Sequence, residues 1–495
     1  MRASSTKKKL QATPRGLTVR LLDHVTLTPR PDGDIVATVG DFSASQFSAS
    51  LGKFGAAAAE RAQHLRAGLP LSAISSTGRA ADKDMHLLVR RLAARGLVEY
   101  PLGRAKGVDQ LVIEPQTPDY QPRPQKLRDS DTLVLSRFAY LRRRADEMVL
   151  ESPRAAALFK IGDPRIAAIF ASLAVPQKVK DIRRQAGFPG IEFLGLLVDC
   201  KILFKVTGRD KGLRPEEGDN DLVLWDFHDL LFHARSTEGR HANPVGGVYA
   251  HFDTMAPLPA LRPNWQGTKI DLQSVAGAQS SGASPAARLL SERHSTRDFD
   301  DSHPITLAEL ERFLEAAARV HATVETPLDP DAGPAAGGPT LTHTVRPYPS
   351  GGASYELELY LAIDKCEGLP RGFYHYDAGA HALTRIEIRD QDLEALLKSG
   401  EFAMGAAGVP QILITIVARF GRVSWKYSSI AYALILKDTG ALMQTFYLMA
   451  TDMRLGGCAI GTTNIDLFEK MTGLPFHAEG PVGQFALGRG LKPQG

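Results

Sequence analysis

The sequence predicts an α+β protein in which two small modules precede one larger C-terminal domain. The chain has 495 residues, more than one hydrophobic core normally serves, so two or three domains are expected. A succession of helix, turn and short strand occurs twice before residue 206. Beyond residue 288, apolar strand patterns at 355–363 and 411–420 are followed by a long apolar helix at 430–454.

Composition and charge favour an ordinary globular protein without a nucleic-acid, membrane or metal partner. Hydrophobic residues make up 43% and charged residues 23% of the chain, and the net charge is only +4. The longest apolar stretch, 430–455, is interrupted by charged residues and so indicates a buried helix. Cys200, Cys366 and Cys458 lie too far apart for a zinc cluster or a disulfide framework. We therefore expect a reducing, cytoplasmic compartment.

The first module is expected at 17–120, after a basic tail at 1–16 that we expect to be disordered. Leu88 and Leu92 have helical spacing, Gly96 stops that helix, and a strand pattern follows at once. A helix, a glycine and a short strand in this order are typical of a winged helix. The sequence therefore predicts a winged-helix-like module.

A second winged-helix-like module is expected within 121–206, behind a charged linker. Helical patterns at 179–182 and 193–198 precede a strand pattern at 202–206. The order of these patterns repeats that of the first module. No other internal repeat is apparent.

Residues 207–287 are expected to connect these modules to the third domain. The segment 225–233 is rich in aromatic residues and contains His228 and His233. These histidines are five positions apart, so they do not share a helix face, and their spacing matches no familiar metal-ligand set. We interpret the segment as an aromatic helix packed on a core, followed by a Ser/Gly-rich linker at 274–286.

The third domain is expected at 288–495. Thr306 and Glu309 form a capping-box signature that opens a helix. The segment 321–346 holds four prolines and several glycines, so we expect a long loop there. The apolar alternation at 355–363 indicates a strand.

A cluster of hydrogen-bond donors opens this domain. Arg293, His294, Ser295 and Arg297 lie within five positions. Guanidinium groups bind phosphate bidentately, and a helical turn would place two arginines four positions apart on one side. The cluster is a candidate phosphate site, although an arginine pair exposed to solvent at a helix start would give the same spacing.

Two glycine-containing segments could bring the backbone close to a flat ligand. One consists of Pro349, Ser350, Gly351 and Gly352, and the other contains Gly456 and Gly457. Backbone N–H groups in such a loop can donate hydrogen bonds to a bound ring system. Each segment also has a plainer interpretation, the first as a simple turn and the second as the end of the helix at 430–454.

The arginine-rich segment and the Pro-Ser-Gly-Gly loop, in this order, resemble the flavin-binding signature of the nitroreductase superfamily. The resemblance implies an FMN-binding domain at the C-terminus. It also implies that Arg489, after the last strand, completes the phosphate clamp. In that superfamily the flavin pocket lies at a subunit interface, so the resemblance implies a homodimer.

Lys426 and Tyr427 narrow the resemblance. They follow the buried strand at 411–420 and, with the aromatic segment upstream, look like the azoline oxidases of the SagB/ThcOx type. The resemblance is close over 225–490 and looser over 17–206. It implies oxidation of thiazolines or oxazolines in a ribosomally made precursor peptide. A cyclodehydratase that makes the azolines is the implied partner.

The chemistry gives the Lys-Tyr pair a role. Aromatising an azoline removes a hydride, which a flavin accepts, and a proton, which needs a base. Neither side chain is a base in its ordinary protonation state, but a lysine beside a tyrosine favours the phenolate, and desolvation favours a neutral lysine. We expect Lys426 and Tyr427 to be catalytic, with the base being either one. A surface lysine beside a core tyrosine is the alternative.

Two other functions fit parts of the sequence. One is a different flavin reaction on the same fold, such as oxidation of a carrier-bound azoline or reduction of a nitro group or quinone. The other is a DNA-binding regulator with a flavin sensor, whose basic helix would carry Lys178, Lys180, Arg183 and Arg184. Its modest charge argues against it. The chain departs from the azoline-oxidase pattern in its long 321–346 segment and in lacking an arginine-rich stretch after Tyr427.

Overall fold

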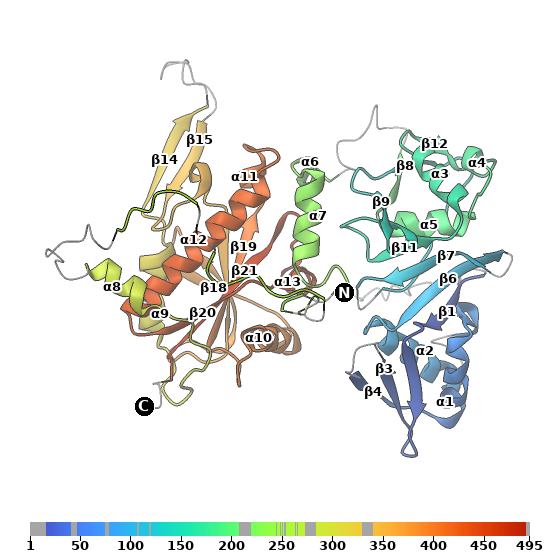
Figure 1. The fold of residues 1–495 in the computed structure, drawn as a ribbon, viewed down its shortest axis with the longest axis horizontal. Helices are drawn as coiled ribbons and strands as arrows, with labels where there is room; N and C mark the ends of the chain where they lie inside the picture. The colour runs from blue at the N-terminus through green and yellow to red at the C-terminus, as the bar shows by residue number, and fades with distance from the viewer. Residues whose placement is uncertain are drawn as a thin grey trace, which may run out of the picture. The chain divides into compact units, whose positions relative to one another are not determined.

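The computed structural model describes residues 16–491 except 41–46, 75–78, 106–107, 118–119, 207–218, 244, 248, 250, 252–253, 263, 265, 273–283 and 329–339. Within these limits the chain forms two compact units (Figure 1). Unit 1 comprises residues up to 235 together with 239–243, and unit 2 comprises 236–238 and the residues from 244 onward. The expected tail at 1–16 lies almost wholly outside the described residues.

Unit 1 is built on a seven-stranded antiparallel sheet in the order β5-β1-β6-β7-β11-β10-β9. Its strands are β1 (Thr18–Leu21), β5 (Leu69–Pro70), β6 (Val98–Ala105), β7 (Val108–Pro115), β9 (Tyr140–Arg144), β10 (Glu147–Glu151) and β11 (Ala157–Ile161). Two three-stranded sheets accompany it, in the orders β2-β3-β4 and β12-β8-β13. Their strands are β2 (Val25–Pro29), β3 (Asp34–Val39), β4 (Phe47–Lys53), β8 (Thr132–Leu135), β12 (Gln177–Lys178) and β13 (Leu203–Val206).

One topology occurs twice in unit 1. In the first copy, strand β1 lies between β5 and β6, and in the second, β8 lies between β12 and β13. Each copy runs from a helix through a two-residue strand and further helix to a final strand. The helices are α1 (Ala56–Gln63) and α2 (Ala80–Ala93) in the first copy, and α3 (Pro164–Ser172), α4 (Val179–Ile182) and α5 (Ile191–Asp199) in the second. The structure thus contains two similar modules, and their assignment as winged helices stays a prediction.

The local signals used for these modules correspond to real helix ends. Helix α2 ends at Ala93, and Gly96 has φ +65° before β6 begins at Val98. Basic residues near α4 are partly neutralised, because Arg183 pairs with Asp129 at 2.7 Å and Arg184 with Asp181 at 3.5 Å. These ion pairs reduce the positive charge that a DNA-binding helix would need there.

The aromatic segment after the two modules forms α6 (Asn220–Val223) and α7 (Phe227–Ser236). Trp225 and His233 are buried and stack with ring centroids 5.8 Å apart. Leu230 and Ala234 of α7 are buried as well. This agrees with the interpretation as an aromatic helix packed on a core.

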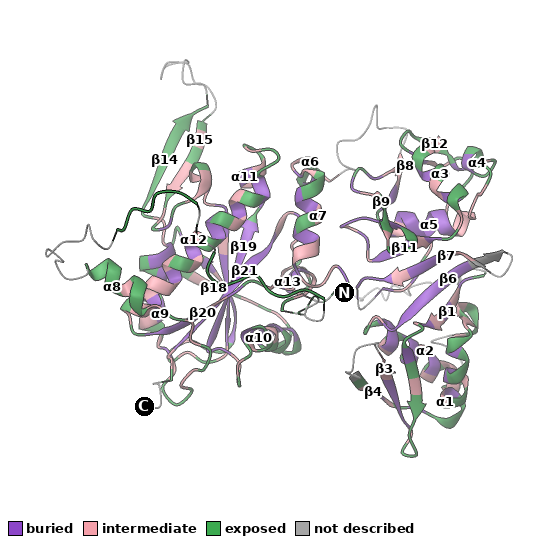
Figure 2. Cartoon of the chain, viewed as in Figure 1, coloured by how far each residue is buried: buried purple, intermediate pink, exposed green. Residues whose placement is uncertain are grey.

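Unit 2 is built on a six-stranded antiparallel sheet in the order β18-β17-β16-β19-β21-β20. Its strands are β16 (Leu357–Ile363), β17 (Gly372–Asp377), β18 (Ala382–Ile386), β19 (Ile412–Arg419), β20 (Gly456–Ile460) and β21 (Glu479–Gly488). The central strand β19 is buried at seven consecutive positions, as its continuous apolar sequence predicts (Figure 2).

Helices cover both faces of this sheet (Figure 1). They are α8 (Pro285–Glu292), α9 (Leu307–Ala318), α10 (Asp390–Met404), α11 (Gly421–Ser424), α12 (Ala431–Asp452) and α13 (Ile465–Thr472). Phe446 of α12 contacts Phe485 of β21 and Phe313 of α9, so α9 and α12 share one face. Ala486, the next residue of β21, joins the core formed with α10 and α13 on the other face.

Two local expectations in unit 2 have clear outcomes. The capping box is confirmed, because Thr306 Oγ1 accepts the Glu309 N–H and Glu309 accepts the Thr306 N–H. The prediction of a long loop at 321–346 is wrong for both ends of that segment. There β14 (Ala322–Pro327) and β15 (Thr340–Val345) pair as a hairpin that is largely exposed (Figures 1 and 2). β-Branched residues on both arms favour these strands, and three of the four prolines fall within 329–339, outside the described residues.

Among the described residues, no helix is both long enough and apolar enough to cross a membrane.

Candidate active site

The candidate phosphate-binding residues 293–297, here called the phosphate segment, are extended and not helical. Helix α8 ends at Glu292, and the Thr296 N–H donates to the Gly457 carbonyl at 2.8 Å. Farther on, Phe299 pairs with Gly490. The expectation that two arginines share one helical turn is therefore wrong. The segment adds to the end of the sheet because its backbone finds partners there, which the spacing of its side chains does not reveal.

Arg293 and Arg297 nevertheless remain available to an anion. The Arg293 guanidinium lies 4.9 Å from the centre of the Tyr447 ring, and Arg297 is exposed. Neither makes an ion pair within the part of the chain that the structure describes. His294 is exposed, and its Nδ1 lies 3.1 Å from the Glu292 carbonyl. Two cations without carboxylate partners are suited to a phosphate.

Tyr447 links the phosphate segment to strand β20, and sequence analysis did not single it out. Its phenol oxygen accepts the Ala459 N–H at 2.9 Å and lies 2.7 Å from Ser295 Oγ. The neighbouring Cys458 is buried, and burial raises the pKa of its thiol, while the positive charge of Arg297 acts in the opposite direction. Nothing in the sequence of α12 distinguished this tyrosine from Tyr432 on the same helix.

Gly456 and Gly457 do not end helix α12. The helix ends at Asp452, and Arg454 takes the left-handed conformation with φ +57°. Both glycines are the first residues of β20, where they allow close packing. A Cβ on Gly456 would lie 2.6 Å from Thr296, and one on Gly457 would lie 2.5 Å from Phe485. They therefore let the phosphate segment approach the sheet.

Arg489 binds Glu309 and His303 within this chain. Its guanidinium donates to both carboxylate oxygens of Glu309, at 2.7 and 2.8 Å, and to the His303 carbonyl at 3.0 Å. Burial alone would raise the pKa of Glu309, but the bonds from Arg489 and Thr306 hold that pKa below its usual value. The part of Arg489 in a phosphate clamp stays a prediction.

Four of the five backbone N–H groups of residues 351–355 donate hydrogen bonds within the described chain. Gly351 N–H donates to Asp438 Oδ2 at 2.8 Å, and Tyr355 N–H donates to Ser350 Oγ at 2.9 Å. The amides of Ala353 and Ser354 donate to carbonyls earlier in the loop. Within the described chain, the Gly352 amide makes no hydrogen bond. It is the one amide of residues 351–355 left for a ligand.

Lys426 and Tyr427 lie at this same glycine. Lys426 Nζ is 3.4 Å from the Gly352 carbonyl and 5.3 Å from the centre of the Tyr427 ring. Gly352 has φ +61°, and a Cβ there would lie 2.2 Å from the Tyr427 hydroxyl. The structure thus brings the predicted catalytic pair to the predicted loop, with Gly352 permitting the contact.

The backbone after Gly352 is held from several sides. Ala353 has φ +53° and Tyr355 has φ +45°, both in the left-handed region that non-glycine residues rarely occupy. His343 of β15 bonds the Ala353 carbonyl at 3.2 Å. Arg422 of α11 donates to the Ser354 carbonyl at 3.0 Å and also to a carbonyl of β15. Unusual backbone conformations held by several bonds often occur at functional sites.

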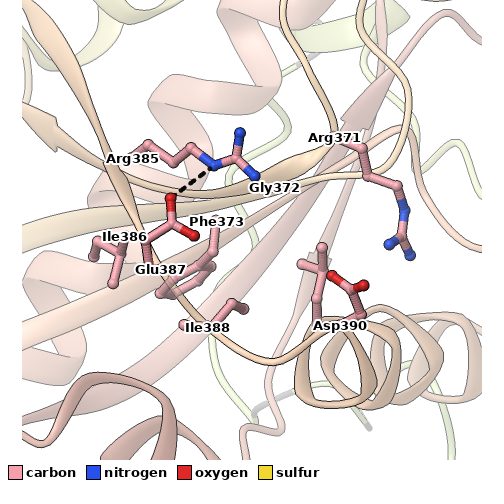
Figure 3. Close-up of a pocket in the computed structure, with 9 residues that line it drawn as sticks. Arg371, Gly372, Phe373, Arg385, Ile386, Glu387, Ile388 and Asp390 are labelled. Atoms are coloured by element: carbon pink, nitrogen blue, oxygen red, sulfur yellow. Dashed lines mark ion pairs between the residues drawn. The ribbon is translucent and has the colours of Figure 1, made fainter.

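A pocket of about 220 Å³ lies at another part of unit 2, where β17 and β18 meet the start of α10 (Figure 3). Arg371 there pairs with Asp364 and Glu394, and Arg385 pairs with Glu387. None of its lining residues is a predicted site residue. Its cations are already paired within the chain, so it carries no assignment.

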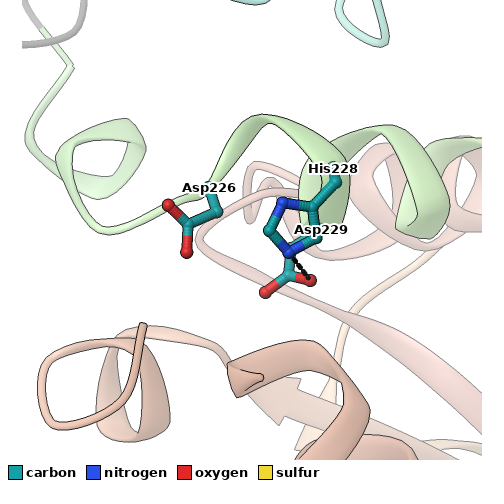
Figure 4. A group of neighbouring side chains, drawn as sticks. All are labelled: Asp226, His228 and Asp229. Carbon is teal, nitrogen blue, oxygen red and sulfur yellow. Dashed lines mark ion pairs between the residues drawn. The ribbon is translucent and has the colours of Figure 1, made fainter. Parts of the chain in front are cut away.

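One group of possible metal ligands occurs at the start of α7 (Figure 4). Ligand atoms of Asp226, His228 and Asp229 lie within 4.8 Å of one another, and His228 Nε2 is 3.2 Å from Asp229 Oδ1. His233, the other histidine of this aromatic segment, is buried and stacks on Trp225. Of the three, Asp229 is buried, Asp226 is half-buried and only His228 is exposed.

Comparisons with known proteins find similarity over two parts of the chain. Residues 290–489 match the nitroreductase family, and residues 133–242 match the family described as cyanobactin oxidase ThcOx. A putative nitroreductase of Methanocaldococcus jannaschii is 27% identical over 173 residues, which are 35% of this chain and 76% of that protein. The microcin B17-processing protein McbC of Escherichia coli is 30% identical over 115 residues, 22% of this chain and 42% of McbC.

A solved structure of the E. coli microcin synthetase McbBCD complex, with truncated pro-MccB17 bound, is also similar. One of its chains is 21% identical, with a TM-score of 0.38, and the alignment covers 55% of this chain and 97% of that chain.

The match over 290–489 assigns unit 2 to the nitroreductase-family oxidoreductases. Residues 133–242, most of which precede that domain, are similar to the ThcOx family, and McbC aligns with part of the chain.

Proposed function

We propose that this protein dehydrogenates thiazolines or oxazolines to thiazoles or oxazoles in a ribosomally made, post-translationally modified peptide, with FMN as the cofactor. One observation carries the proposal. Lys426 and Tyr427 converge on Gly352, whose amide has no partner within the described chain. A hydrogen-bond donor for a ring and a candidate base therefore lie side by side.

The chain's own residues suit FMN at both ends of the molecule. Arg293 and Arg297 offer charge to the phosphate, and the Gly352 N–H offers a hydrogen bond to the ring. Bound FMN would supply a two-electron acceptor for the hydride of the azoline. Tyr447 would orient the phosphate segment through Ser295.

Lys426 and Tyr427 would handle the proton. Lys426 Nζ lies 5.3 Å from the centre of the Tyr427 ring, and the pair lies at the loop that would face the flavin ring. In this role one of the two takes the Cα proton of the azoline, and the Gly352 carbonyl orients Lys426. Both assignments of the base remain compatible with this geometry.

The candidate site has two halves: the phosphate half, which is the segment 293–297 with Tyr447, and the loop half, which is the loop 349–352 with Lys426 and Tyr427. Their placement on the fold fits a homodimer whose sites combine halves from both subunits. Tyr447 and Asp438 are nine residues apart on α12, which corresponds to about 13 Å along the axis and about two and a half turns. The phosphate half and the loop half therefore project from opposite sides of one helix. We propose that each flavin contacts the phosphate half of one subunit and the loop half of its partner.

Exposed apolar side chains support a partner subunit. Helix α8 leads directly into the phosphate segment, and its Leu290 is 56% exposed. Similar exposure occurs along 254–272, at Met255, Leu258, Leu261, Ile270 and Leu272. Burial of these residues in a dimer would remove apolar area from water.

We further propose that the substrate is a precursor peptide delivered with a cyclodehydratase. The similarity to McbC and to a chain of the complex with bound pro-MccB17 supports this choice. The two modules of unit 1, which we propose to be winged-helix-like, would position the peptide by adding it to a free strand edge. The cytoplasm would be the compartment, as the three unpaired cysteines suggest.

The cofactor and the reaction can be tested together. The purified protein is expected to be yellow, to release FMN on denaturation, and to remove two hydrogen atoms from a synthetic thiazoline peptide. Arg297→Ala should weaken FMN binding by about 1.5–3 kcal/mol, the worth of a hydrogen bond to a charged group. Titration of apoprotein with FMN, followed by quenching of flavin fluorescence, measures this loss.

Arg312→Ala is the matched control, because Arg312 is an exposed arginine of α9 that is not among the candidate site residues. It should bind FMN as the wild type does. A colourless protein that fails to bind added FMN would end the flavin proposal.

Mixing two defective chains tests the composite site. Arg297→Ala and Lys426→Ala are each expected to be weakly active alone at an FMN concentration that saturates the wild type and Lys426→Ala but not Arg297→Ala. Heterodimers formed by co-expression should contain one intact site, so an equal mixture should recover about a quarter of wild-type activity. Recovery no greater than the average of the two variants would place both half-sites of a flavin pocket in one chain.

A further inference from the structure

Two buried carboxyl groups lie beneath the Gly351–Gly352 backbone. Glu356, next to the start of β16, is 0% exposed, and Asp438 of α12 is 7% exposed. Ser350 Oγ lies between them, 2.9 Å from Asp438 Oδ2 and 3.3 Å from Glu356 Oε2. The single hydroxyl hydrogen of Ser350 can serve only one of these two carboxyls at a time.

The two carboxyls have different surroundings. Asp438 Oδ2 accepts the Gly351 N–H as well as the Ser350 hydroxyl, which favours a charged carboxylate. Glu356 Oε1 is buried and has no hydrogen-bond partner among the described residues, which favours a neutral acid. Burial raises the pKa of Glu356 to about 7, and the negative charge of Asp438 adds to the effect.

Other charged or titratable groups face this pair from neighbouring elements. The guanidinium of Arg422 on α11 and that of Arg346 before the loop both donate to backbone carbonyls. The buried Tyr348 phenol also lies close enough to interact with Glu356. Arg419 and Glu358 lie nearby on β19 and β16, and Arg419 Nη1 is 3.7 Å from Glu358. The Arg422 guanidinium interacts electrostatically with Glu356, and it is held by hydrogen bonds to the Ser354 and Thr342 carbonyls.

We propose that Glu356 and Asp438 are positioning residues for the reaction, which share one proton and so fix the Gly351–Gly352 backbone against FMN and the Lys426–Tyr427 pair. The inference rests on the proposed function. Asp438 holds the loop through the Gly351 amide and the Ser350 hydroxyl. Protonated Glu356 leaves Asp438 as the only negative charge beside Ser350.

The pair gives the loop a defined pH dependence. With its pKa raised in the folded protein, Glu356 adds stability that is fully present below the ordinary carboxyl pKa. That stability is lost as pH rises toward about 7. Above that pH a second buried negative charge would oppose Asp438. The loop would loosen, and FMN would bind less tightly.

Glu356→Gln separates the role of the proton from the presence of the side chain, because the amide imitates the neutral acid. FMN affinity is measured by fluorescence at about pH 6.5 and about pH 8.5 for the wild type, Glu356→Gln, Asp438→Asn and Glu358→Gln. The FMN affinity of the wild type should fall by roughly tenfold or more between the lower and the higher pH. In Glu356→Gln most of this fall should be absent. Asp438→Asn should bind roughly tenfold more weakly at both pH values, as expected when a bond to a charged group is lost.

Glu358→Gln is the matched control, because Glu358 is two residues farther along the chain, on β16, and pairs with His375 and Arg419. It should keep the wild-type pH dependence, and comparison between variants cancels the titration of the FMN phosphate itself. A Glu356→Gln protein with the full wild-type pH dependence, or an Asp438→Asn protein with wild-type affinity, would overturn the inference.

A second measurement does not depend on FMN. The midpoint of thermal unfolding of the apoprotein should fall as pH rises from about 5 to about 8, and the fall should be smaller in Glu356→Gln. If the wild type binds no FMN, the proposed function fails, but the melting comparison still tests the carboxyl pair. If the unfolding midpoint falls equally in the wild type and in Glu356→Gln, the proton on Glu356 does not contribute to the pH dependence of stability.

Discussion

Lys426→Ala and Tyr427→Phe are each expected to keep FMN bound while azole formation slows by about 10²-fold or more. A positioned proton acceptor is usually worth this much, and the two side chains meet at Gly352. Neither is part of the phosphate half, so FMN affinity should change little. Single-turnover oxidation of a thiazoline peptide under saturating FMN measures the effect.

Lys437→Ala serves as the control for this pair, since Lys437 is an exposed lysine of α12. It should turn over like the wild type. Dithionite should reduce the flavin in all three variants, which separates a lost base from a damaged cofactor site. Normal turnover in both Lys426→Ala and Tyr427→Phe would show that the pair is structural.

Gly352→Ala is expected to lower activity by about 10²-fold, whereas Gly351→Ala should have a small effect. A Cβ at Gly352 would lie 2.2 Å from the Tyr427 hydroxyl and 2.9 Å from Lys426 Nζ, at φ +61°. The pair must then move, and a shift of about 1 Å in a catalytic group can cost 10²-fold. Steady-state kinetics on both variants measures the contrast.

Gly351 is a close match for this comparison because it is the preceding residue of the same loop. The nearest atoms to a Cβ there are 3.5 Å away, an ordinary contact, and its φ is not in the left-handed region. Unfolding curves for both variants would check that the loss does not come from global instability. Equal activity of the two variants would contradict the role assigned to the Gly352 contact.

The parts of unit 2 that sequence analysis predicted are those with local causes. The capping box depends on residues three positions apart, and the burial of β19 follows from its continuous apolar sequence. The repeated topology of unit 1 was likewise visible in the order of local patterns. The hairpin of β14 and β15 was missed because the glycines and prolines between its arms dominated the composition of the segment.

The contacts within the candidate site could not be predicted in the same way. Lys426 and Gly352 are 74 positions apart, and Ser350 and Asp438 are 88 apart. Their motifs were recognisable, but the convergence depends on how β16, β19 and α12 pack. Asp438 resembles any other charged residue of a helix until its burial is known.

Arg489 illustrates the opposite case. The resemblance implied that it completes a phosphate clamp, yet its Nη2 donates to both carboxylate oxygens of Glu309 and its Nε to the His303 carbonyl. The same carboxylate closes the capping box of α9. The Glu309 side chain therefore both caps helix α9 and binds Arg489. A motif in the sequence does not reveal this double role.

The left-handed residues of the 350–355 loop have a consequence for the thermodynamics of binding. Ala353 and Tyr355 occupy conformations that cost on the order of 1–3 kcal/mol each, and Arg422, His343 and Asp438 hold the loop around them. Ordering a free backbone costs about 1–2 kcal/mol per residue. Because folding has already ordered this loop, little of that entropy is left for a ligand to lose, and more of its contact energy is retained as affinity.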